Sequence, residues 1–89
     1  MQPAHSDQQD EDLRSAILAE FMADSRIASS DLRVGVLNGI AHLAGNVNSL
    51  DQRRLAEEIA GQVPGVRGVV NRIEAPGAPS PARMINLDL

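Results

Sequence analysis

Apolar residues recur at helical spacing in the first third of the chain. Leu13, Ile17 and Phe21 stand at i, i+4 and i+8, so one face of a helix carries all three. Leu18 and Met22 form a second apolar row beside them. Together the two rows predict an amphipathic helix with a wide buried face.

The stretch before this helix is polar and acidic. We expect residues 1–9 to be disordered and the helix to start between Asp7 and Asp12, where carboxylates stabilise the positive end of the helix dipole. The acidic side chains lack the spacing of an EF-hand calcium loop, and we interpret them as a solvated charge run. They are Asp7, Asp10, Glu11 and Asp12.

From residue 32 the pattern changes to alternation. Leu32, Val34 and Val36 occupy every second position, which is the period of a β-strand. The pair Asn38-Gly39 follows at once and is the strongest short hairpin signal, because both residues tolerate a positive φ. Alternation then resumes and predicts a second strand, with one face formed by Ala41, Leu43, Gly45 and Val47.

A two-residue turn also determines how the two strands pair. Leu37 is expected opposite Ile40, and Gly35 opposite His42. The core face of the hairpin then consists of Val34, Val36, Ala41 and Leu43. Leu37, Ile40 and His42 share the other face, and a slip by one residue would scramble this agreement.

The next segment predicts a second helix. Ser49 to Gln52 fits a capping box, and an apolar row follows at Leu55, Ile59 and Val63. The sequence Val63-Pro64-Gly65 ends the helix near Gln62. The opposite, charged face contains two pairs at i, i+4 spacing, which are Arg53–Glu57 and Arg54–Glu58.

Val66 to Glu74 is predicted as a third strand, with Val69 and Ile73 on one face and Val70 and Arg72 on the other. A right-handed crossover should connect it to the second strand, but the pattern leaves open which strand it lies beside.

The composition shifts at Ala75. Residues 75–82 form a linker rich in Pro and Ala, which favours a stiff extended conformation. Residues 83–89 follow as a flexible tail, in which Ile85, Leu87 and Leu89 alternate with polar residues. Such a tail is either plain disorder or a docking strand that adds to an open sheet edge.

These elements predict a single α+β domain over residues 10–74. Their order is α-β-β-α-β, which gives a two-layer sandwich with a three-stranded sheet and two helices on one face. The chain has 89 residues, a length that leaves no room for a second core.

Charge and composition narrow the function. The net charge is −4, and Phe21 is the only aromatic residue. Nucleic-acid binding needs a basic surface and aromatic platforms for bases, so we expect no nucleic-acid partner. The negative charge also argues against simple electrostatic attraction to anionic lipid.

The residues offer no enzyme site. His5 and His42 without any cysteine do not make a metal site, and no glycine-rich phosphate loop follows a strand. The serines are better explained as turn and cap residues, namely Ser29, Ser30 and Ser49. We therefore expect no catalytic residue, no metal and no cofactor.

No run of 18 apolar residues is present, so the chain is not expected to span a membrane. The N-terminus has neither the basic nor the apolar region of a signal peptide. The location stays open between the cytoplasm and, for a processed form, the periplasm.

Three segments together resemble the BON domain family. The stretch 34–47 is similar to the central BON signature, with alternating valines, Asn-Gly, and a strand that ends Leu-Ala-Gly-Asn-Val. The segments 52–60 and 63–73 are similar to the second half of that module, and Ala23 to Ile27 to the usual exit of its first helix. The resemblance covers residues 10–74.

The resemblance implies the same α-β-β-α-β sandwich and a non-catalytic binding or scaffold role. BON modules occur in bacterial osmotic-stress and envelope proteins, for which phospholipid binding is proposed. At least one cytosolic relative binds potassium, which implies a potassium-responsive module as an alternative function. The family has no fixed catalytic residues to transfer.

The hairpin register suggests where such a module makes contact. Leu37, Ile40 and His42 face away from the helices, with Val70 near them, and adjacent aliphatic residues on a wet face can form a contact patch. Scattered exposed aliphatic residues are equally common. We expect a lipid or protein partner or self-association at this patch, with an adaptor acting through the tail as the alternative.

Overall fold

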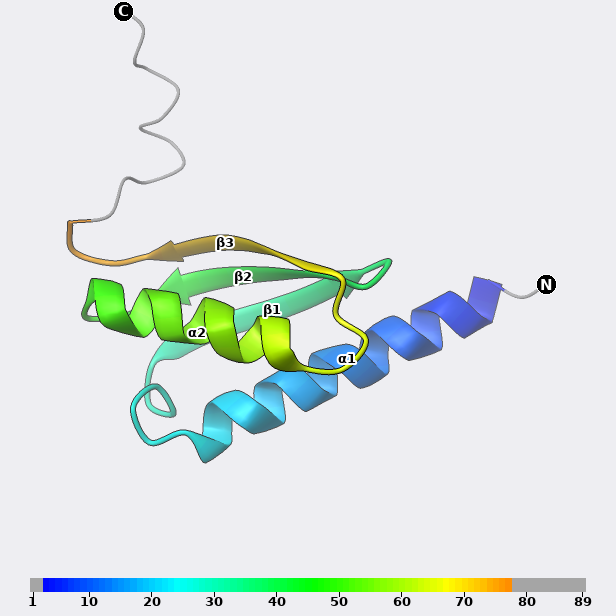
Figure 1. The fold of residues 1–89 in the computed structure, drawn as a ribbon, viewed down its shortest axis with the longest axis horizontal. Coiled ribbons are helices and arrows are strands. Elements are labelled where there is room, and N and C mark those ends of the chain that lie inside the picture. Colours follow the sequence, from blue (N-terminus) through cyan, green and yellow to red (C-terminus); the bar gives the residue numbers. More distant parts are fainter. Residues whose placement is uncertain (1–2, 78–89) are drawn as a thin grey trace, which may run out of the picture.

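The structure is a computed structural model that describes residues 3–77, and the side chains from residue 8 onward. The chain runs α-β-β-α-β, which confirms the predicted fold class (Figure 1). Its elements are α1 (Pro3–Ala23), β1 (Asp31–Leu37), β2 (Ile40–Asn46), α2 (Leu50–Gln62) and β3 (Gly68–Glu74).

Helix α1 begins earlier than the sequence pattern indicates. It starts at Pro3 rather than between Asp7 and Asp12, and so includes residues 3–9, which we expected to be disordered. Proline suits the first turn of a helix, where its missing N–H is not needed. A contact from Asp10 to the hairpin, described below, also holds this end of the helix against the sheet.

The sheet has the strand order β1-β2-β3. Strands β1 and β2 are antiparallel, and Leu37 lies opposite Ile40 and Gly35 opposite His42, so the predicted hairpin register is confirmed. Strand β3 lies beside β2 and parallel to it, which answers the question of strand order that the sequence left open.

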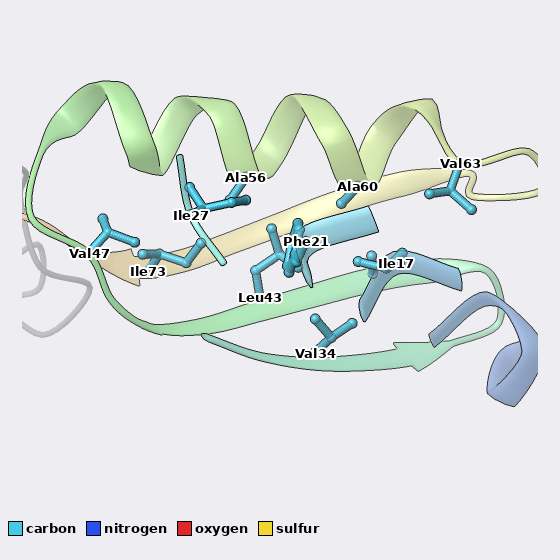
Figure 2. Packing of buried hydrophobic residues seen from close by; sticks show 11 residues of the cluster. Ile17, Phe21, Ile27, Val34, Leu43, Val47, Ala56, Ala60, Val63 and Ile73 are labelled. Atoms are coloured by element: carbon cyan, nitrogen blue, oxygen red, sulfur yellow. The ribbon is translucent and has the colours of Figure 1, made fainter. Parts of the chain in front are cut away.

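Both helices cover one face of the sheet (Figure 1). The buried side chains of the hairpin, Val34, Ala41 and Leu43, point toward the helices, as the alternation predicted. Figure 2 shows Ile17 and Phe21 from α1 and Ala56 and Ala60 from α2 above Val34 and Leu43. The rest of the buried core is Ile27, Val47, Val63 and Ile73.

The wide buried face predicted for α1 is narrower in the structure. Leu18 packs against the core, but Met22 is 72% exposed. Residues advance about 100° per position around a helix, so Met22 lies about 140° from Ile17, the centre of the buried stripe. The prediction for Met22 was therefore wrong.

Helix α2 begins as the capping-box motif predicts. The hydroxyl of Ser49 accepts a hydrogen bond from the backbone N–H of Gln52 (3.1 Å). The side chain of Gln52 accepts one from the N–H of Asn48 (2.7 Å), one residue before the position that a standard capping box uses. These bonds determine where α2, the helix that connects β2 to β3, begins.

Candidate contact surface on the open face of the sheet

The face of the sheet opposite the helices is formed by every second residue of each strand. In the described part of the chain, no helix packs on it (Figure 1). Strand pairing arranges its side chains in rows that run across all three strands. From the hairpin end, the rows are Leu37–Ile40–Gly68, Gly35–His42–Val70, Arg33–Ala44–Arg72 and Asp31–Asn46–Glu74.

The row at the hairpin end is apolar. Leu37 is 63% exposed, and Ile40 beside it is half-buried. The Cδ1 of Ile40 lies 3.3 Å from where a Cβ would sit on Gly68, so the isoleucine side chain extends over the third strand. Leu37 and Ile40 thus form an apolar strip that reaches from β1 to β3.

The second row places the two other predicted surface residues side by side. His42 is exposed, and Val70 is its half-buried neighbour on β3. On the other side of His42, Gly35 leaves the backbone bare, because no atom lies within 4 Å of the position its Cβ would take. All four residues of the predicted contact patch are therefore neighbours on one face of the sheet.

The remaining rows are charged. Arg33 and Arg72 flank Ala44, and neither arginine forms a salt bridge within the part of the chain that the structure describes. Asp31 and Glu74 stand in the last row, farthest from the turn. The open face is thus apolar at the hairpin end, basic in the middle and acidic at the far end.

The turn that terminates this face is fastened to α1. Asn38 and Gly39 have φ values of 54° and 81°, the left-handed region that a type I′ turn requires. Their backbone N–H groups point at the carboxylate of Asp10, at 2.9 and 3.0 Å. The carboxylate of Asp10 thus accepts two hydrogen bonds, one on each oxygen, from two consecutive amides.

Arg67, in the loop between α2 and β3, contacts the same turn. Its backbone N–H donates to the carbonyl of Gly39 (2.8 Å), and its guanidinium approaches the carbonyl of Asn38 (3.4 Å). A Cβ on Gly39 would come within 2.7 Å of the Arg67 Cδ, so glycine is required both for the turn and for the arginine to lie there.

Both outer edges of the sheet are protected by arginine side chains. Val47 donates to the carbonyl of Glu74, so the carbonyls of Asn71 and Ile73 point away from β2. Arg53 of α2 donates to both of them, at 3.2 and 2.8 Å.

At the other edge, Arg14 of α1 donates to the carbonyl of Val34 (3.0 Å).

The interpretation of Arg53 and Arg54 as paired with Glu57 and Glu58 was wrong. Arg53 bonds to the strand edge instead, and Arg54 approaches Asp51 (3.5 Å).

Sequence reasoning missed Asp10, Arg14, Arg53 and Arg67 as residues with specific partners. Each bonds to backbone groups 18 to 29 residues away, and no local pattern signals such a contact. The predicted docking tail, Ile85, Leu87 and Leu89, lies outside the described residues.

A hollow of about 690 Å³ lies elsewhere, at the start of α2. Its arginines already have acidic partners, because Arg26 contacts Asp24 (2.6 Å) and Arg54 contacts Asp51 (3.5 Å). Among the side chains of residues 8–77, no three of His, Asp or Glu gather in a way that suits a metal ion. Neither helix there combines the length and the apolar character needed to cross a bilayer.

Comparison with known proteins places this geometry in a family. The sequence profile described as the BON domain matches residues 9–77. Osmotically-inducible protein Y of Escherichia coli (strain K12) is 37% identical over 60 residues, which is 67% of this chain. The matched segment spans about 30% of that protein's length.

Proposed function

This chain belongs to the BON domain family, and on that premise we propose that it is a non-enzymatic binding module whose open sheet face docks on phospholipid. The observation that carries the proposal is the order of the rows on that face, with Leu37 exposed at one end. The name of the relative, osmotically-inducible protein, supports a role in the response to osmotic stress.

The order of the rows favours a membrane surface over a flat protein partner. Successive rows are about 7 Å apart along the strands. If the face approaches with its hairpin end lowest, the side chains of Leu37 and Ile40 reach the apolar boundary, while Arg33 and Arg72, two rows behind, extend toward the phosphates from the aqueous side. The acidic row at Asp31 and Glu74 is then held away from the lipid.

Overall charge opposes rather than drives this contact. The net charge of −4 repels an anionic surface over about a Debye length, near 8 Å at physiological salt. Attraction must therefore come from the buried apolar area of the hairpin end and the local arginine pair. Binding driven in this way should persist at salt concentrations that abolish purely electrostatic adsorption.

Vesicle flotation tests the proposal. Vesicles of phosphatidylglycerol mixed with phosphatidylcholine should carry the chain to the top of the gradient, and Leu37→Asp should reduce the floated fraction at least about fivefold. Burying a leucine side chain in the membrane would stabilise the bound state by about 1.5–3 kcal/mol. A fivefold loss of binding corresponds to about 1 kcal/mol, so removing the leucine should cost at least that much.

Met22→Asp is the matched control. Met22 is as exposed as Leu37 but lies on α1, away from the proposed surface, so its substitution adds the same charge without touching the contact. Absence of flotation, or equal loss with both variants, would contradict docking through this face.

The adaptor alternative is distinguished in the same assay. A strand added by the tail at the β3 edge would have to displace Arg53 from two carbonyls. Deletion of residues 83–89 should therefore leave flotation unchanged, whereas loss of binding on deletion would transfer the function to the tail. Equal flotation in potassium and sodium salts is expected, and a potassium requirement would favour the ion-responsive alternative.

A further inference from the structure

The hairpin turn has the geometry of an anion site. The N–H groups of Asn38 and Gly39 converge on one point, where the two oxygens of the Asp10 carboxylate accept them at 2.9 and 3.0 Å. Consecutive amides in a left-handed turn form a concave, positively polarised nest of the kind that binds phosphate. This nest already contains an anion, supplied by the chain's own first helix.

The surroundings of the nest suit a larger anion than a carboxylate. Arg67 lies over Gly39, with its side chain exposed and one long hydrogen bond, at 3.4 Å, to the carbonyl of Asn38. A guanidinium has five donors, so it retains capacity for a further acceptor. A hollow of about 200 Å³ lies here, lined by Gln9, Asp10, Leu13, Asn38, Gly39, Gly65 and Arg67.

Two glycines allow the walls of this hollow to come close to the turn. At Gly39 a Cβ would collide with the Arg67 stem, and at Gly65 (φ 100°) it would come within 3.0 Å of Leu13 Cδ2. The arginine stem and α1 can therefore both approach the turn closely. We call this hollow the cradle. The amides of Asn38 and Gly39 and the guanidinium of Arg67 line it, and the carboxylate of Asp10 occupies the two amides.

We infer that this cradle is a phosphate-binding site and that Asp10 is its internal competitor. A phosphate group presents the same pair of acceptor oxygens to the amides and further oxygens to Arg67, which bonds phosphate with a planar set of donors. Binding requires the Asp10 carboxylate to leave the two amides, since two anions cannot share them. Helix α1 thus regulates access to the site.

The inference rests on the proposed function for its biological source of phosphate and deepens it. Leu37 directly precedes the turn. When its side chain reaches the apolar boundary, the backbone of the turn stands about one side-chain length farther out, beside the lipid headgroups. A phospholipid phosphate would then replace Asp10 as the apolar row is buried. Free phosphate offers the same chemistry without the membrane.

Amide chemical shifts of the full 89-residue chain test the inference, with inorganic phosphate as the probe and sodium chloride at matched ionic strength as the reference. In Asp10→Ala, phosphate should cause saturable shifts at Asn38 and Gly39. The apparent affinity should exceed that of the native chain at least about tenfold, near the worth of one charge-assisted hydrogen bond. Adding Arg67→Gln to Asp10→Ala should remove the saturable response.

Asp12→Ala is the matched control, because it removes one negative charge from the same helix, and within the described residues the Asp12 side chain accepts a hydrogen bond only from Gln8 (3.0 Å). It should behave as the native chain does. Asp10→Asn, which keeps the size of the side chain and one acceptor oxygen, guards against loss of the fold and should give an intermediate affinity. Linear shifts in Asp10→Ala, or equal affinity in the Asp10 and Asp12 variants, would overturn the inference.

A vesicle arm separates this inference from the proposed function. Phosphate binding in Asp10→Ala without flotation on phosphatidylglycerol vesicles would support the cradle, identify free phosphate as its ligand and reject the membrane role. Flotation that depends on Leu37 but is unaffected by Asp10→Ala, with no saturable phosphate response, would do the opposite. Increased flotation of Asp10→Ala together with phosphate binding would support both.

Discussion

Arg53 gives the sharpest test of how this small sheet is stabilised. Its guanidinium donates to the carbonyls of Ile73 and Asn71 at the outer edge of β3, at 2.8 and 3.2 Å. Asn71 returns a bond from its side-chain amide to the carbonyl of Arg53 (3.2 Å). The pair braces α2 against the strand from both sides, and Arg53→Ala removes the arginine half of that brace.

The magnitude follows from the two bonds that are lost. A hydrogen bond with a charged donor contributes about 1.5–3 kcal/mol when it is buried. These two are only partly buried, so we expect Arg53→Ala to lower the free energy of unfolding by roughly 1–3 kcal/mol in total. For a domain of this size, 1 kcal/mol corresponds to about 4–8 °C in the melting temperature.

Arg54→Ala is a control that differs by one position. It removes the same side chain from the same helix, but within the described residues Arg54 makes only an exposed salt bridge, to Asp51 at 3.5 Å, and such pairs contribute about 0–1 kcal/mol. Urea unfolding of both variants should show the larger shift of the transition midpoint for Arg53→Ala. The dependence of the unfolding free energy on urea concentration should stay unchanged in both. Equal shifts within about 0.3 kcal/mol would refute the brace.

Three further predictions concern the core, the hairpin and the exit of the first helix. Leu43→Ala should lower the free energy of unfolding by about 2–5 kcal/mol in urea, because the side chain is 1% exposed, and a loss below about 1 kcal/mol would contradict its central place. Gly45→Ala should prevent folding or cost more than about 3 kcal/mol, since φ is 123° and a Cβ would lie 2.0 Å from a backbone oxygen. Gly35→Ala, where that space is empty, should change stability by less than about 0.5 kcal/mol, and similar costs at both glycines would be unexpected. Hydrogen bonds from Arg26 lower the pKa of Asp24 below its usual 3.8, so their contribution to stability is present above that value and is lost as the pH falls through the lowered pKa. An NMR titration should show the pKa of Asp24 rising toward 3.8 in Arg26→Ala, and an unchanged pKa would rule out this cause.

The sequence was sufficient to predict the architecture because each element depends on local chemistry. Alternation defined the strands, and Asn38-Gly39 determined the register, which assigned Leu37 and Ile40 to the face opposite the helices. The capping residue Ser49 marked the start of α2. These features depend on neighbours within a few residues, which is the range over which a single sequence is informative.

The residues that fasten the elements together were not predictable in the same way. Asp10 was interpreted as part of a solvated acidic run, yet it bonds to two amides 28 and 29 residues away. Arg53 was interpreted as one charge on a solvent-facing side of its helix, yet it protects a strand edge. Such contacts depend on where whole elements meet, and a side chain bonded to distant backbone leaves no periodic signal.

The face of contact is the central claim, and a paramagnetic footprint tests it most directly. The chain is mixed with phosphatidylglycerol-containing bicelles that carry a spin-labelled lipid, and amide line broadening is measured residue by residue. Broadening should be strongest at Leu37 and Ile40, weaker at Arg33 and Arg72, and absent at Ala56 in α2. Broadening centred on the helices, or none at the hairpin end, would contradict docking through the open face of the sheet.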